Sequence, residues 1–141
     1  MSEGLKLHFE VAPDDIAAAG NASTGTKNTL KKMGFPAAII RRVAIAMYEG
    51  EINMVIHAKG GDVDVEIQPD RIVMTLADRG PGIPDIDLAM QEGWSTATEN
   101  VREYGFGAGM GLPNMKKNTD EMRIDTQLGV GTTVTMTVYV A

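Results

Sequence analysis

The sequence contains no cysteine, which excludes a disulfide framework and a thiolate metal site. Aromatic residues are also scarce, at 5% of the chain, whereas methionine occurs ten times. Because methionine is flexible and fills irregular gaps, we expect an aliphatic and adaptable core. At 141 residues, the chain is long enough to bury such a core, and we expect one domain over residues 1–141.

Long apolar runs and an excess of positive charge are missing as well. No apolar run approaches the roughly 18 residues of a membrane span, and the first residues do not form a basic segment followed by an apolar one. The net charge of −6 argues against binding to nucleic acid or to an anionic membrane. We therefore expect a cytoplasmic protein that binds neither.

The pattern of apolar residues predicts an α+β chain. Strict alternation over residues 5–11 predicts a half-buried strand. Asp14 or Asp15 is expected to cap a first helix that ends at Gly34, and a second helix is expected from Pro36 to Gly60. Further strands are expected over 63–67, 71–77, 122–126 and 132–140, with short helices over 85–92 and 113–118.

This order of elements predicts a two-layer α/β sandwich, with a mixed, mostly antiparallel sheet covered by helices on one face. A doubly wound parallel sheet would need strands and helices to alternate strictly, and they do not.

Asp78 ends an expected buried strand and is followed by two glycines and two prolines. Because strand side chains alternate between faces, Asp78 shares the apolar face of Met74 and Leu76. A carboxylate on an apolar face needs a hydrogen-bond partner. One interpretation is an aspartate that caps its own turn. The other is a ligand contact, to which the glycines give the backbone close access. Thr132 shares the parity of the apolar face of the last strand.

Glu49, Asn53 and His57 are spaced four residues apart in the second expected helix. Successive members turn by about 400°, so they line one face, whereas Glu51 lies about 200° from Glu49 and faces elsewhere. A carboxylate could accept a proton from an attacking hydroxyl, and an amide oxygen suits Mg²⁺ beside phosphates. The alternative is a solvated helix face. Gly50, unfavourable inside a helix, suggests that something approaches the backbone there.

A long stretch without periodicity, residues 93–111, ends in a glycine-rich run before a helix. Free N–H groups at such a helix start can bind phosphate. The run matches neither a P-loop nor the dinucleotide-binding fingerprint, because the required Gly-Lys-Ser/Thr and the third glycine are absent. The alternative is a loop without a ligand.

Taken together, these motifs resemble the GHKL ATPase superfamily. In this chain, Glu49-x-x-x-Asn53 resembles the N box of the superfamily, and Asp78-x-Gly80-x-Gly82 resembles its G1 box. Gly107-x-Gly109-x-Gly111 resembles the G2 box, and Gly131-Thr132 resembles the last Gly-Thr element. The resemblance covers roughly residues 40–140 in the correct order. It implies the Bergerat ATP-binding fold, with ATP and Mg²⁺ as cofactors and a lid over residues 93–111.

The resemblance also implies roles for individual residues. Glu49 would be the catalytic base, Asn53 the magnesium ligand and Asp78 the residue that reads adenine. The nucleotide-binding residues would be Asn53, Asp78, Gly80, Gly82, Ile83, Gly105, Gly107, Gly109, Met110, Gly111, Leu112 and Thr132.

Within that superfamily the chain resembles the small serine kinases of the anti-sigma-factor and stressosome switch group. This implies an ATP-dependent serine/threonine kinase whose partner is an anti-sigma-antagonist-like (STAS) domain or a sigma factor, and a possible homodimer. The group often has Arg before the N-box Asn, where this chain has Ile52. A second hypothesis is therefore a nucleotide-gated anti-sigma factor or accessory module with little or no phosphoryl transfer.

Overall fold

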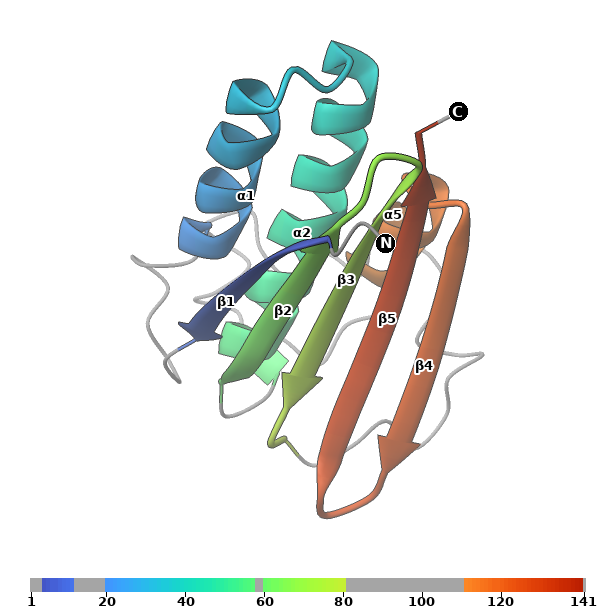
Figure 1. Cartoon of the computed structure of the whole chain (residues 1–141). Helices are drawn as coiled ribbons and strands as arrows, with labels where there is room; N and C mark the ends of the chain where they lie inside the picture. The colour runs from blue at the N-terminus through green and yellow to red at the C-terminus, as the bar shows by residue number, and fades with distance from the viewer. Residues whose placement is uncertain (1–3, 12–19, 58–59, 81–110, 141) are drawn as a thin grey trace, which may run out of the picture.

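The computed structural model describes residues 4–11, 20–57, 60–80 and 111–140. The strands form one five-stranded sheet, and the helices pack on one side of it (Figure 1). The strands are β1 (Leu5–Val11), β2 (Gly61–Ile67), β3 (Arg71–Asp78), β4 (Glu121–Gln127) and β5 (Gly131–Tyr139). The helices are α1 (Asn21–Lys32), α2 (Ala37–His57) and α5 (Gly111–Lys117). The predicted α+β sandwich is confirmed.

The strand order is β1-β2-β3-β5-β4, and every pairing among the described strands is antiparallel. The expected sheet was mixed, but no parallel pair occurs among these strands. β1 and β4 form the two edges of the sheet, and β3 lies at its centre (Figure 1). The end of β3, where Asp78 lies, is therefore enclosed by β2 on one side and β5 on the other.

The core lies between the helices and one face of the sheet. Strand residues alternate between buried and exposed, as in β2, where Val63, Val65 and Ile67 are at most 1% exposed. Met74 on β3 and Met136 on β5 are fully buried opposite each other in the register. The expected aliphatic, methionine-containing core is therefore present, and the opposite face of the sheet carries polar side chains.

The predicted start of the first helix is wrong. α1 begins at Asn21, because Gly20 has a φ of 103° and interrupts any helix that runs through it. The expected cap at Asp14 or Asp15 lies outside the described residues. Gly25 lies within the helix, and the Phe9 ring occupies the space where a side chain would extend.

The other described elements agree with the predictions to within a few residues. α2 begins one residue after Pro36 and ends before Gly60. α5 begins at Gly111, two residues before the expected Pro113. The helix predicted over 85–92 lies outside the described residues, as does the stretch predicted over 93–111 except for Gly111, which begins α5. Among the described residues, no helix is both long and apolar enough to span a membrane.

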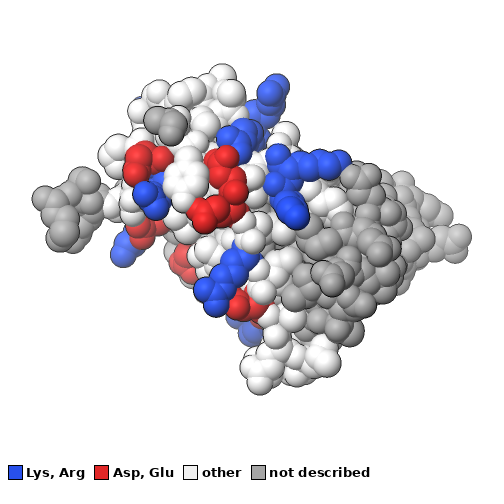
Figure 2. All heavy atoms as spheres, turned by 90° about the vertical axis from the view of Figure 1, so that its right-hand side faces the viewer, with Lys and Arg blue, Asp and Glu red and all other residues white. Residues whose placement is uncertain are grey.

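Charged side chains of both signs are interspersed on the side of the molecule near β4 (Figure 2). Two ion pairs involve residues in β4 or just before it: Arg42 with Asp120 at 3.2 Å and Arg123 with Asp125 at 3.0 Å. The positive charges in these pairs are therefore largely compensated locally.

Candidate functional site

Glu49 and Asn53 both contact α5, the helix that follows the glycine-rich run. The side-chain nitrogen of Asn53 lies 3.8 Å from the sulfur of Met115. The side chain of Asn114 hydrogen-bonds Glu49. Both α2 residues are half-buried. The structure therefore places both side chains against the middle of α5, and a fully solvated helix face does not describe them.

Burial raises the pKa of Glu49 above its ordinary value, and the hydrogen bond from Asn114 opposes part of that rise. A carboxylate with a raised pKa holds a proton more strongly than an exposed one. This environment suits a general base, because proton transfer is most efficient when the pKa of the base approaches the working pH.

The close approach expected at Gly50 comes from the protein core. A Cβ added at Gly50 would lie 2.3 Å from Cδ2 of Leu76 and 3.4 Å from Cε of Met115. The glycine therefore lets α2 pack closely against β3 and α5. This contact has a structural explanation, and it gives no evidence of a ligand at the backbone.

Asp78 uses one carboxylate oxygen to organise the end of β3. Its Oδ1 accepts hydrogen bonds from the backbone N–H groups of Gly80, at 2.9 Å, and Thr132, at 3.0 Å. The bond to Gly80 is the predicted turn cap, and the bond to Thr132 joins β3 to β5. Both bonds go to Oδ1, and among the described residues no hydrogen bond reaches Oδ2, which could accept one from a ligand.

Two glycines hold the backbone of Asp78 between the neighbouring strands. A Cβ at Gly131 would lie 2.1 Å from the carbonyl oxygen of Asp78, and one at Gly61 would lie 2.7 Å from its Cα. Their φ angles of 154° and 156° also favour glycine. The Cβ added at Gly61 would also lie 2.8 Å from Cε of Met54, the residue that follows Asn53 in α2. Gly61 therefore marks where β2, the end of β3 and α2 meet.

Thr132 is buried, as its strand parity predicts, with 5% of its surface exposed. Its hydroxyl oxygen lies 2.9 Å from that of Thr126 on β4. Its backbone N–H is bound to Asp78, so the predicted pair of Asp78 and Thr132 is in direct contact.

Glu51 is the buried carboxylate that the sequence reasoning did not assign to a role. It is 2% exposed and lies on α2 between Glu49 and Asn53 in sequence. Its oxygens accept three backbone N–H groups at the start of α1, from Gly20 at 3.1 Å, Ala22 at 3.0 Å and Ser23 at 2.6 Å. Gly20 itself provides no side-chain cap, so Glu51 caps α1 from another helix.

The remaining predicted residues divide into two groups. Gly80 is buried, Gly111 is the first residue of α5, and Leu112 is half-buried against the core. The others lie outside the described residues, and these are Gly82, Ile83, Gly105, Gly107, Gly109 and Met110.

Comparisons with known proteins show the family to which the chain belongs. The family of histidine kinase-, DNA gyrase B- and HSP90-like ATPases matches residues 40–141. The serine/threonine-protein kinase RsbT of Bacillus subtilis is 32% identical over 124 residues, covering 85% of each chain. An anti-sigma F factor of Caldanaerobacter subterraneus is 34% identical over 106 residues, covering 72% of this chain and 71% of that protein.

A solved structure shares the fold. The RsbU and RsbW domains of a Mycobacterium tuberculosis protein match with a TM-score of 0.64 at 21% identity. The match covers 95% of this chain and 32% of the other. The predicted superfamily is confirmed, and the chain belongs to the histidine kinase-, DNA gyrase B- and HSP90-like ATPase family.

Proposed function

We propose that this protein is an ATP-dependent serine/threonine kinase that phosphorylates a regulatory partner protein. The observation that carries the proposal is Glu49, a half-buried carboxylate with a raised pKa that lies one helical turn from Asn53 and is hydrogen-bonded by Asn114 of α5. The named kinase among the relatives supports it.

Glu49 would accept the proton of the partner's hydroxyl as that oxygen attacks the terminal phosphate of ATP. Transfer then joins this oxygen to phosphorus, breaks the bond to ADP, and leaves the proton on the carboxyl group. The raised pKa fits this role, because it makes the carboxylate a better acceptor than an exposed glutamate.

The donor set around Asn53 fits a magnesium ion. Its amide nitrogen faces the sulfur of Met115, which leaves the amide oxygen as the atom for a cation, and Mg²⁺ prefers oxygen ligands while keeping several waters. Asn53 would hold the ion, which would neutralise charge on the phosphates.

Asp78 would recognise adenine. With Oδ1 committed to Gly80 and Thr132, Oδ2 would accept a hydrogen bond from the amino group of the base. Gly82, Ile83 and the run from Gly105 to Leu112 stay predictions for the rest of the nucleotide site. We expect catalysis in the cytoplasm, and dimerisation also stays a prediction.

The partner would be an anti-sigma-antagonist-like domain or a sigma factor, in line with the names of the anti-sigma F relatives. These names also support a second candidate function, a nucleotide-gated anti-sigma factor that senses ATP and transfers little or no phosphate. Intact Glu49 favours the first function.

An assay with labelled ATP and magnesium tests both candidate functions. The protein is incubated with purified candidate partner domains, and the label on each protein is measured. We expect label on a serine or threonine of the partner, and its loss in Glu49→Gln while ATP binding persists. Equal transfer by Glu49→Gln would refute the assignment of the base. Stable binding of a sigma factor without any transfer would support the second function.

A further inference from the structure

Charged side chains gather on the outer face of the β1–β2 ladder, away from the helices. Glu10 on β1 lies directly opposite Asp62 on β2, and His8 lies directly opposite Asp64. Two carboxylates that face each other across a strand pair destabilise the pairing. A bound cation would remove this repulsion at the end of an edge strand.

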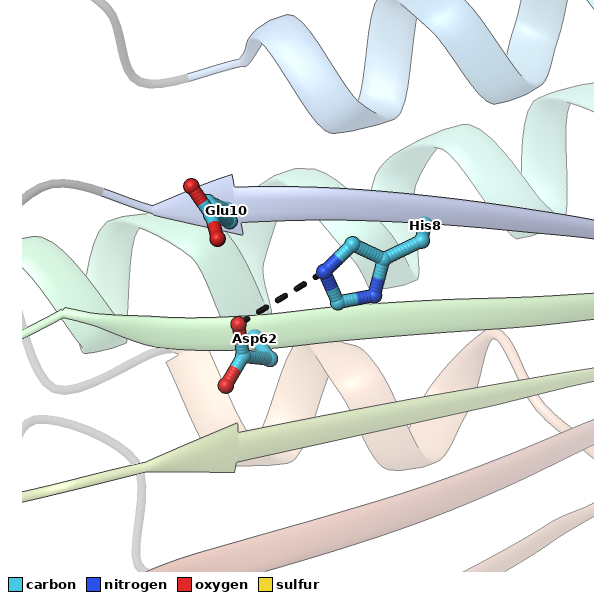
Figure 3. A group of neighbouring side chains, drawn as sticks. All are labelled: His8, Glu10 and Asp62. Carbon is cyan, nitrogen blue, oxygen red and sulfur yellow. Dashed lines mark ion pairs between the residues drawn. The ribbon is translucent and has the colours of Figure 1, made fainter.

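The histidine is oriented toward two aspartates of β2, Asp62 and Asp64. Its Nδ1 lies 2.7 Å from Oδ1 of Asp64, and since a carboxylate only accepts, Nδ1 carries the proton. Its Nε2 lies 3.6 Å from Oδ1 of Asp62 (Figure 3). One ligand atom from each of His8, Glu10 and Asp62 lies within 4.8 Å of the others.

We propose that His8, Glu10 and Asp62 form a binding site for a divalent transition metal of the Zn²⁺ type, with Asp64 orienting the imidazole. One imidazole and two carboxylates are ligands that Zn²⁺ accepts, with water in a fourth position. Ligand atoms around tetrahedral Zn²⁺ lie about 3.3 Å apart, so the side chains must close in on the ion. His8 and Asp62 have exposed side chains that can make this movement.

The hydrogen bond from His8 to Asp64 matches a common feature of metal sites, in which a carboxylate holds the histidine nitrogen that does not bind the ion. It leaves Nε2, on the side of Asp62, unprotonated in the neutral ring. This feature favours a metal that binds imidazole, and it distinguishes the site from the oxygen-based site proposed for Mg²⁺ at Asn53.

The guanidinium group of Arg79 competes with the ion. Arg79 lies 3.3 Å from Oδ2 of Asp62, whereas Oδ1 of Asp62 is the oxygen nearest His8. The arginine and a metal can therefore use different oxygens of the same carboxylate. The metal would tie the edge strand β1 to β2, a role that does not depend on the proposed kinase activity.

Calorimetric titration of Zn²⁺ into the full chain, without any affinity tag and in a large excess of Mg²⁺, tests the proposal. The excess Mg²⁺ occupies sites made of oxygen alone. We expect one saturable site, and at least a tenfold loss of affinity in His8→Ala and in Asp62→Asn. Asp64→Asn should weaken binding by about tenfold, because it removes only the orienting partner.

Glu66→Gln is the matched control, since Glu66 lies on β2 with the same strand parity but outside the cluster. It should bind Zn²⁺ like the wild type. The chain has two histidines, so imidazole NMR gives a second readout in which Zn²⁺ should shift the His8 resonances. Absence of saturable binding, equal affinity in His8→Ala, or unshifted His8 resonances would overturn the proposal. Should His8→Ala fail to fold, Glu10→Gln provides the same comparison.

Discussion

Two carboxylates on α2 lie two residues apart and have different surroundings. Glu51 faces α1, is 2% exposed, and accepts three backbone N–H groups. Glu49 faces α5, is half-buried, and is bonded by the side chain of Asn114. Burial raises the pKa of both, so the difference lies in their partners. A carboxylate whose oxygens accept hydrogen bonds from the backbone has a structural role. A carboxylate without such backbone partners can still accept a proton in a reaction.

Asp78 lies between these two cases. Its Oδ1 is committed to two backbone N–H groups, as in Glu51, but both bonds use that one atom. It therefore helps to hold β3 against β5, and its second oxygen accepts no hydrogen bond from the described residues. The three carboxylates form a series from structural to reactive, and substitution of each one tests the series.

The largest effect is expected for phosphoryl transfer in Glu49→Gln. Loss of the general base should lower the transfer rate by about 10²–10⁴-fold, measured with labelled ATP and a partner domain. Glu51→Gln is the matched control, because it makes the same chemical change two residues away. Glu51→Gln should transfer phosphate at a rate close to that of the wild type wherever it is folded. A similar loss of transfer rate in both variants would contradict the assignment of Glu49 as reactive and Glu51 as structural.

The next largest effect is expected for stability in Glu51→Ala. Three N–H groups at the start of α1 would lose their acceptor, which should lower the free energy of unfolding by about 3 kcal/mol. Urea denaturation followed by circular dichroism measures this change. Glu49→Ala should cost less, because no backbone N–H group among the described residues depends on Glu49. If Glu49→Ala were the more damaging of the two, Glu51 would not be the principal cap of α1.

A smaller effect is expected for nucleotide binding in Asp78→Asn. The amide oxygen can keep the bonds to Gly80 and Thr132, but the amide nitrogen would replace the oxygen proposed to accept from adenine. Affinity for ATP should fall by about tenfold to a hundredfold, with a smaller change in stability. Calorimetric titration with ATP measures the first quantity. Unchanged affinity would show that Asp78 only caps its turn.

The smallest effect is expected in the pH dependence of stability. Because burial raises the pKa of Glu49, the native state binds more protons than the unfolded state between the ordinary and the raised pKa. The contribution of Glu49 to stability should therefore fall as pH rises through that window and be regained as pH falls. Urea denaturation at several pH values should show this dependence in the wild type and less of it in Glu49→Gln. Identical profiles would contradict the raised pKa.

For the strands that the structure describes, the predictions that rest on local periodicity were confirmed. Alternation correctly assigns the buried faces of β2, β3 and β5, because a strand has period two wherever it packs. It also correctly gives Asp78 and Thr132 a shared side of the sheet, and the structure shows them in direct contact. The start of α1 was predicted wrongly, because its cap comes from Glu51, about thirty residues away along the chain.

The sequence by itself determined the order of the elements, the apolar faces and the spacing of Glu49, Asn53 and Asp78. These depend on the repeat of helix and strand, which a single segment contains. Only the tertiary structure decided that Leu76 fills the space at Gly50, that Gly61 and Gly131 enclose Asp78, and that Glu51 caps α1. The reason is that a hydrogen-bond partner or a close contact depends on which distant segments pack together.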